Sequence, residues 1–185
     1  IAVNPDRGYA LSIRGVAREV AASLGLSYRD PVDALRGVTF KDTGKGVSAK
    51  IVDLDAASVF YLRTLSNFDQ SASTPLWMRR RIEKMGMRSI SLVVDITNYV
   101  MLELGQPLHA FDADKIAGAL SIKRAGAAQK FTTLDGQERT LDPDDLMVWD
   151  DSQPLALAGT MGGLESEITE STTPCLLYTS PSPRD

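Results

Sequence analysis

Histidine and cysteine, the residues on which most metal and nucleophile sites depend, are almost absent from this sequence. Among its 185 residues there is one of each, His109 and Cys175. A single histidine cannot build a zinc site by itself, and no serine, histidine and aspartate stand in the sequence context of a catalytic triad. The sequence therefore excludes the familiar zinc and serine hydrolases.

Long apolar runs and an excess of positive charge are also missing. No apolar stretch approaches the roughly 20 residues that cross a bilayer, and no signal-peptide pattern opens the chain, so a cytoplasmic location is the default expectation. The formal net charge of −4 gives no indication of a nucleic-acid-binding protein. With 43% hydrophobic and 24% charged residues, the composition is that of an ordinary globular protein.

One local cluster runs against the negative total. The run Arg79–Arg81, followed by Lys84 and Arg88, comes shortly after Trp77. Most such runs are the solvated face of a helix, and the alternative is contact with phosphate groups. The sequence leaves both interpretations open, so any contact with nucleic acid must be local.

Three segments carry the apolar spacing and the end signals of helices, over residues 13–24, 75–85 and 91–104. Ser12 is the predicted cap of the first helix and Gly25 its end, and the third helix begins at Ser89 or Ser91. The residues predicted to turn inward from the second helix are Met78, Ile82 and Met85.

Most of the remaining chain predicts β structure. The segment 58–65 is β-branched and aromatic on both faces, which favours a strand inside a sheet, and Asp135-Gly136 predicts a two-residue hairpin turn. Helices and strands alternate without a regular βαβ repeat, so the expected fold class is α+β, with a mixed or antiparallel sheet and packed helices. The predicted strands are 47–51, 58–65, 120–123, 131–134, 138–141, 146–149 and 155–158.

The segment from Asp95 to Asp112 contains the single histidine and the helix that we expect to face it. Pro107 prevents the helix from continuing, so the chain must return as an extended segment over 108–111. That return brings His109 near Asn98. The alternative is that His109 is a satisfied core histidine and Asn98 a hydrogen-bonding residue at the helix edge.

Glycines gather after the predicted strand 155–158, at Gly159, Gly162 and Gly163. A glycine at a strand end lets backbone N–H groups approach a ligand closely. The spacing lacks the lysine and hydroxyl residue of a P-loop, and no G-x-G-x-x-G opens a helix here. A plain turn is the alternative to a binding loop.

Four motifs occur in a familiar order between Asn4 and Gly163: NPDRGYALSIRGVAREVA, DITNYVMLELGQPLHAFD, TLDGQERTL and PLALAGTMGG. Together they resemble the editing region, called B3/B4, of the β subunit of bacterial phenylalanyl-tRNA synthetase. The resemblance implies that this region hydrolyses tyrosine wrongly attached to tRNA(Phe). An aminoacyl ester is already activated, so orienting a water and binding the tRNA 3′ end would suffice.

The resemblance also implies roles for single residues. His109 and Asn98 would be the catalytic residues beside the ester and the terminal adenosine, with Thr97 next to Asn98 in the pocket. The residues implied for the pocket wall are Ala158, Gly159 and Gly162. One position departs from the family, because the glutamate that accepts the tyrosine phenol, nineteen residues after the glycine equivalent to Gly159, is replaced here by Tyr178.

Tyr178 lies in CLLYTSPSPRD, residues 175–185, which resembles the translation of a DNA-sequencing adapter. We interpret this tail as a read-through artefact outside the fold and set Cys175 aside with it. The expected organisation is then 1–30 as the end of a preceding B1-like domain and 31–174 as a C-terminally truncated editing domain. A first residue of Ile1 rather than methionine favours a fragment of a longer polypeptide.

The resemblance implies partners and cofactors for a parent enzyme, a ligase that attaches phenylalanine to its tRNA. These are an α subunit in an α2β2 assembly and the 3′ end of tRNA(Phe), with ATP and magnesium bound elsewhere, no cofactor or metal in this segment, and no membrane partner. Two alternatives stay open. The chain could be a free-standing deacylase that acts in trans, or a non-catalytic domain for tRNA docking or assembly.

Overall fold

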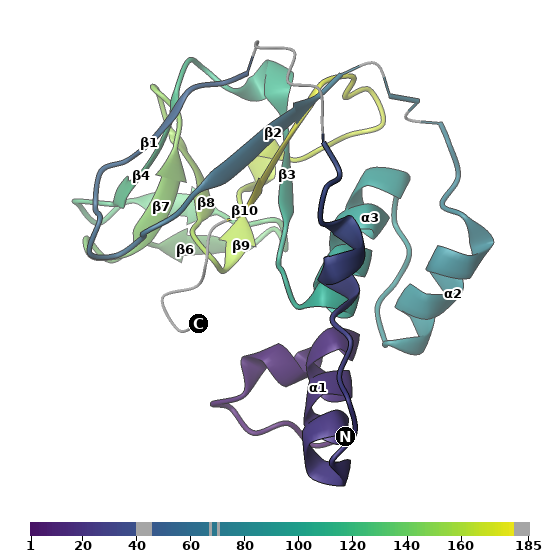
Figure 1. Ribbon diagram of the computed structural model, residues 1–185. Helices are drawn as coiled ribbons and strands as arrows, with labels where there is room; N and C mark the ends of the chain where they lie inside the picture. The colour runs from purple at the N-terminus through teal and green to yellow at the C-terminus, as the bar shows by residue number, and fades with distance from the viewer. Residues whose placement is uncertain (40–45, 67, 70, 180–185) are drawn as a thin grey trace. The chain divides into compact units, whose positions relative to one another are not determined.

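The computed structural model describes residues 1–39, 46–66, 68–69 and 71–179. The chain divides into two compact units (Figure 1). The first unit comprises Ile1–Gly44 with Ser73–Leu108, and the second comprises Lys45–Ala72 with His109–Asp185. The boundary after residue 30 stays a prediction about the parent protein, and the compact units follow a different division.

The first unit is helical, and the three predicted helices are present. They are α1, Ile13–Leu24; α2, Leu76–Lys84; and α3, Leu92–Leu104. Short 3-10 turns occur at Gly8–Leu11 and Pro31–Leu35. Ser12 and Ser91 cap α1 and α3 by accepting backbone N–H groups, and Gly25 and Gly105 end these helices in the left-handed conformation.

The second helix differs from its prediction at one residue. Met78 and Ile82 are buried, as expected, but Met85 is 41% exposed. The reason is that α2 ends at Lys84, so Met85 lies beyond the last helical turn and does not share the inward face.

The second unit contains a mixed sheet. Among the described residues it has five strands in the order β1-β4-β7-β8-β9, with β1 parallel to β4 and the other neighbours antiparallel. This arrangement confirms the expected α+β class. The strands are β1, Ala49–Ile51; β4, Leu120–Arg124; β7, Leu146–Trp149; β8, Pro154–Leu157; and β9, Met161–Gly162.

A second, antiparallel sheet has the order β2-β10-β3 within the described part of the chain. Its strands are β2, Tyr61–Leu65; β10, Cys175–Thr179; and β3, His109–Asp112. The expectation that 58–65 forms an interior strand is wrong, because β2 is an edge strand on which Tyr61 is 68% exposed. Branched and aromatic residues report strand propensity, not burial on both faces.

The expectation that residues 175–185 stay outside the fold does not hold for Cys175–Thr179. These residues form the middle strand of the second sheet, paired on both edges. Cys175, Leu176 and Tyr178 are buried there, so the segment supplies the apolar side chains and backbone pairing that the position requires. The origin of the tail as an adapter translation stays a prediction, and residues 180–185 lie outside the described residues.

A separate hairpin joins β5, Lys130–Thr132, to β6, Glu138–Thr140. Its loop has three residues and not the predicted two, because the Thr133 N–H donates to the Gln137 carbonyl across Leu134, Asp135 and Gly136. Gly136 has a φ of 74°, which suits the left-handed end of a three-residue loop.

The main core of the second unit lies between its two larger sheets. Phe111, Leu176 and Tyr178 come from the β2-β10-β3 sheet, and Leu120, Val148, Leu155 and Ala156 come from the five-stranded sheet. The strand ends that border this core carry four residues of the candidate site, His109, Ala158, Gly159 and Gly162.

Candidate functional site

His109 begins β3 and lies opposite Tyr178 of β10. Its ring packs edge to face against two aromatic rings, with centroid distances of 4.8 Å to Phe111 and 5.5 Å to Tyr178. Phe111 and Tyr178 are themselves stacked at 4.9 Å. The imidazole is therefore held at the end of an aromatic row whose other members belong to the core.

Gly162 of β9 lies against the Cε1–Nε2 edge of the imidazole. A methyl group added at Gly162 would lie 2.3 Å from His109 Cε1 and 2.4 Å from Nε2. The close approach of ring and backbone therefore requires glycine at this position. The structure thus brings together two residues that the resemblance implied for one site.

Enclosure by these neighbours sets the charge of the imidazole. Burial lowers the pKa of His109 to about 4. At neutral pH the ring is uncharged, so one nitrogen carries a proton and the other has a free lone pair. The free lone pair can accept a hydrogen bond from a water molecule and so orient it, although a pKa of about 4 makes the ring a weak base at neutral pH.

Ala158 and Gly159 lie in the tight turn between β8 and β9. The Thr160 N–H donates to the Leu157 carbonyl at 3.1 Å, and Gly159 has a φ of 68°. Gly159 is exposed, whereas Ala158 packs partly against the core. The predicted pocket-wall residues are thus neighbours on one β-hairpin, with Gly162 on its returning strand.

Asn98 and Thr97 lie on α3, in the other unit. Thr97 is buried, and its hydroxyl donates to the Val94 carbonyl at 2.7 Å, while Asn98 is half-buried. The position of these two residues beside His109 stays a prediction.

A buried carboxylate that the sequence analysis missed fixes the start of α3. Asp95 accepts hydrogen bonds from the Thr74 hydroxyl at 2.5 Å, the Ser89 hydroxyl at 2.5 Å and the Ile90 N–H at 2.9 Å. It therefore ties the entry to α2 and the connection into α3 to the helix that carries Asn98. The only sequence signal for this role of Asp95 was the presence of a carboxylate on the face of the predicted helix.

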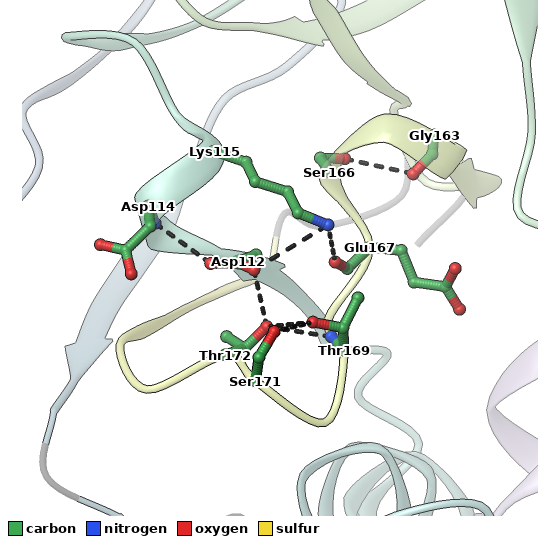
Figure 2. Close-up of polar contacts among 9 residues, drawn as sticks. All are labelled: Asp112, Asp114, Lys115, Gly163, Ser166, Glu167, Thr169, Ser171 and Thr172. Atoms are coloured by element: carbon green, nitrogen blue, oxygen red, sulfur yellow. Dashed lines mark hydrogen bonds and ion pairs between the residues drawn. The ribbon is translucent and has the colours of Figure 1, made fainter.

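A second missed network holds the loop between β9 and β10 to β3 (Figure 2). The buried carboxylate of Asp112 accepts from the Thr172 hydroxyl at 2.6 Å and from the Asp114 N–H at 3.2 Å. Thr172 also accepts the Thr169 N–H at 2.9 Å, and Lys115 donates to the Glu167 carbonyl at 2.8 Å. Asp112 and Thr172 are 60 residues apart in the sequence, so no local pattern could have predicted their hydrogen bond.

Ser166 completes the same loop nearer to the glycines. Its hydroxyl lies 3.1 Å from the Leu155 carbonyl of β8. It also lies 3.2 Å from the Gly163 carbonyl (Figure 2), so it closes the chain just after Gly162. The backbone around Gly162 is thus fixed from both sides, by the β8–β9 pairing and by Ser166.

Tyr178 fills the position at which the resemblance implies a glutamate. Burial raises the pKa of its phenol well above the ordinary value, so the group is neutral. Burial, aided by the nearby Asp112 carboxylate, also raises the pKa of Cys175 to about 11, so this thiol is protonated and is not an activated nucleophile.

Two further kinds of feature are absent from the described residues, a metal-binding cluster and a membrane-spanning helix. Within them, no three histidine, cysteine, aspartate or glutamate side chains gather in a way that would hold a metal ion. No helix in the same part of the chain has both the length and the apolar character needed to cross a membrane.

Comparisons with known proteins agree with the motifs. The chain is 52% identical over 177 residues to the phenylalanine–tRNA ligase beta subunit of Thermobifida fusca, and 54% identical over 175 residues to that of Streptomyces avermitilis. These alignments cover 96% and 94% of the chain, which spans about a fifth (21%) of each relative.

The fold is also similar to a solved structure, an N-terminal fragment of the phenylalanyl-tRNA synthetase beta subunit from Pyrococcus horikoshii. The TM-score is 0.59 at 15% sequence identity, and the match covers 95% of this chain and 52% of the other. The family model named B3/4 domain matches residues 56–180. The chain therefore belongs to the B3/4 domain family.

Proposed function

We propose that this chain is the editing region of a phenylalanine–tRNA ligase β subunit and that it hydrolyses tyrosyl-tRNA(Phe). The observation that supports this most directly is the neutral imidazole of His109 held against the Gly162 backbone. The ligase activity, with ATP, magnesium, an α subunit and a cytoplasmic location, belongs to the longer protein in this proposal.

A separate hydrolytic site is physically sensible for this pair of amino acids. An apolar pocket that accepts phenylalanine rejects the extra hydroxyl of tyrosine only weakly, whereas a site that hydrogen-bonds the phenol strongly rejects phenylalanine. A second site can therefore remove the error that the first one lets through.

In the proposed mechanism, His109 orients the attacking water next to the ester while Asn98 binds the terminal adenosine. The glycine hairpin brings backbone groups close to the tyrosine moiety, with Ala158 and Gly159 at its turn. Binding and orientation supply the catalysis, since the ester bond is already activated.

Position 178 decides specificity in this proposal. A glutamate there would accept the phenol hydroxyl of the bound tyrosine, but Tyr178 instead packs its own ring between Phe60 and Phe111. We expect the chain to bind the tyrosyl group poorly until Tyr178 is replaced, because its ring occupies the space beside His109.

The test uses a chimera in which residues 56–180 replace the matching segment of the Thermobifida fusca β subunit, co-expressed with its α subunit. The chimera carrying Tyr178→Glu should deacylate tyrosyl-tRNA(Phe), and adding His109→Ala should slow this by about 10²-fold. Phenylalanine attachment should stay unchanged in both, which shows that the complex is intact.

The matched control is Tyr61→Ala, which removes an exposed ring of the same unit on the far edge of the β2-β10-β3 sheet. Its deacylation rate should equal that of the Tyr178→Glu chimera. The proposal is wrong if His109→Ala and Asn98→Ala both leave deacylation of the mischarged tRNA unchanged.

A further inference from the structure

One face of α2 combines an exposed aromatic ring with positive charge. Trp77, Arg80, Arg81 and Lys84 follow the spacing i, i+3, i+4, i+7, so they lie on one side of the helix. All four are exposed, while Met78 and Ile82 on the opposite side are buried. We call these four residues the α2 basic face.

The charge of this face is only partly neutralised. Arg81 donates to the Tyr99 hydroxyl at 2.7 Å and lies 3.8 Å from the Glu103 carboxylate. Arg80 and Lys84 make no ion pair with any residue in the described part of the chain. Two adjacent, solvated cations are thus available to an anion in a chain whose total charge is negative.

Trp77 is fixed but open to solvent. It is 53% exposed, and its ring meets that of Tyr99 edge to face, with a centroid distance of 5.3 Å and an angle of 88°. The Arg81 guanidinium lies 5.5 Å from the Trp77 centroid. A large exposed ring held in place by two neighbours is a surface on which a flat partner can stack at little cost in side-chain entropy.

A cleft of about 340 Å³ borders the same face. Arg81 and Lys84 stand at its border with Glu103, so cations, an acceptor and an apolar floor adjoin one another. The apolar part of the lining comes from Ile13, Met85, Tyr99 and Leu102.

We propose that the α2 basic face binds single-stranded RNA, with phosphates on Arg80 and Lys84 and a base stacked on Trp77. Cations that follow the backbone, interleaved with an aromatic ring, are the arrangement by which proteins bind single strands without reading their sequence. An anionic membrane would use the charges but has no need of the fixed ring or the cleft. The assignment of this RNA to a tRNA rests on the proposed function, whereas RNA binding itself does not.

The test measures binding of a fluorescein-labelled 12-nucleotide poly(U) strand to the full 185-residue chain by anisotropy, at several salt concentrations. The variant Arg80→Glu/Lys84→Glu should bind about 25-fold more weakly at 0.1 M salt, because each lost phosphate contact removes roughly 0.7 from the slope of log affinity against log salt. The slope itself should fall by about 1.4.

The matched control is Arg18→Glu/Arg36→Glu, which changes the net charge by the same amount at exposed cations of the same unit that lie outside α2. It should bind as the parent chain does. Equal weakening in both variants would show that only bulk charge attracts the RNA, and an unchanged Arg80→Glu/Lys84→Glu variant would also overturn the proposal.

Stacking on Trp77 has its own readout. The chain has two tryptophans, so Trp149→Phe leaves Trp77 as the only one. Poly(U) should quench its fluorescence, and Trp77→Phe, which keeps a ring against Tyr99, should weaken binding by a few-fold. Vesicles of anionic lipid that bind more tightly than poly(U) would favour a membrane partner and contradict the RNA assignment.

These measurements are independent of hydrolysis. RNA binding by the parent chain with no deacylation in the chimera would sink the proposed function alone. Deacylation in the chimera with no effect of Arg80→Glu/Lys84→Glu on KM would sink the α2 site alone.

Discussion

At the scale of single residues, the contact between Gly162 and His109 allows the sharpest prediction. Gly162→Ala places a methyl group 2.3 Å from the imidazole and 3.1 Å from Leu134 Cδ1, so the ring or the strand must move. We expect a loss of about 1–3 kcal/mol in the free energy of unfolding, as for other overpacked sites.

Urea unfolding checks this prediction against Gly46→Ala in the same unit. A methyl group at Gly46 meets only the Thr64 hydroxyl at 3.9 Å, an ordinary contact, and its backbone does not have a positive φ. Its free energy of unfolding should differ from that of the parent chain by no more than about 0.5 kcal/mol, as for a surface change. Equal midpoints for the two variants would contradict the close packing of ring and backbone.

The protonation of His109 predicts a dependence of stability on pH. Its pKa is about 4 in the folded chain and about 6.5 in the unfolded chain, so the unfolded state binds more protons between these values. The free energy of unfolding should therefore fall as the pH drops from 6.5 to 4, by up to about 3 kcal/mol. His109→Gln should lose this part of the dependence.

Carboxylates such as Asp135 and Asp150, whose pKa values are lowered, lose their contribution to the free energy of unfolding at still lower pH. They do so in the parent chain and in His109→Gln alike, so the difference between these two proteins isolates the contribution of His109. Because this chain has one histidine, its ring-proton NMR signals need no assignment. A titration midpoint near 6.5 in the folded chain would show that the ring is not enclosed.

The residues of the candidate site were only partly predictable. His109 stood out as a lone histidine and Gly162 as a strand-end glycine, the resemblance placed both in one site, and their functional roles stay predictions. Asp95 and Asp112 were missed, because their meaning comes from partners brought near by folding, such as Thr74 and Thr172. Asn98 beside His109 stays a prediction.

At the scale of elements, the loop between β9 and β10 depends on one buried hydroxyl. Thr172→Val keeps the shape of the side chain but removes the donor to Asp112 and the acceptor of the Thr169 N–H. We expect a loss of about 1–3 kcal/mol, because a buried carboxylate then lacks a hydrogen bond. Amide hydrogen exchange at Thr169 should become faster.

Ser171→Ala is the control for this loop. Ser171 is exposed, and its hydroxyl lies 3.0 Å from that of Thr169. Its removal should leave both the unfolding midpoint and the exchange at Thr169 near the values of the parent chain. A Thr172→Val variant as stable as Ser171→Ala would show that the Asp112 network does not hold the loop.

Helices were predicted more accurately than strands, and the physical reason is range. The ends of α1 and α3 are encoded by adjacent residues, Ser12 with Gly25 and Ser91 with Gly105. Strand positions depend on partners far away in the sequence. The edge position of β2 is set by β10, more than 100 residues later, and no local pattern in 58–65 contains that information.

At the scale of the whole molecule, the sequence predicted the α+β class but not the division into units. That division joins Ser73–Leu108 to the N-terminal residues, because α3 packs on α1 and not because the segments are adjacent. The methyl group that Gly105 lacks would lie 2.9 Å from the Ser12 hydroxyl, which shows how closely the two helices meet. Contacts between helices depend on how their surfaces fit together, and the spacing of residues along the sequence does not show which surfaces meet.

The outward face of α1 carries the last prediction. Val20 is 48% exposed and Leu24 is 67% exposed, and a largely apolar cleft of about 840 Å³ lies along the same helix. Apolar surface of this extent favours association in water. We expect the 185-residue chain to self-associate at micromolar concentration, and Val20→Lys/Leu24→Glu, which leaves the net charge unchanged, to keep it monomeric.

Sedimentation velocity over a range of concentrations measures this association. The matched control is Val38→Lys/Leu54→Glu, which makes the same two chemical changes at exposed apolar residues outside α1. If the control dissociates the chain as well as Val20→Lys/Leu24→Glu does, the association is general and α1 has no special part in it. If only the α1 variant is monomeric, the apolar face of α1 is the surface that brings the copies together, because net charge and side-chain types are the same in both variants.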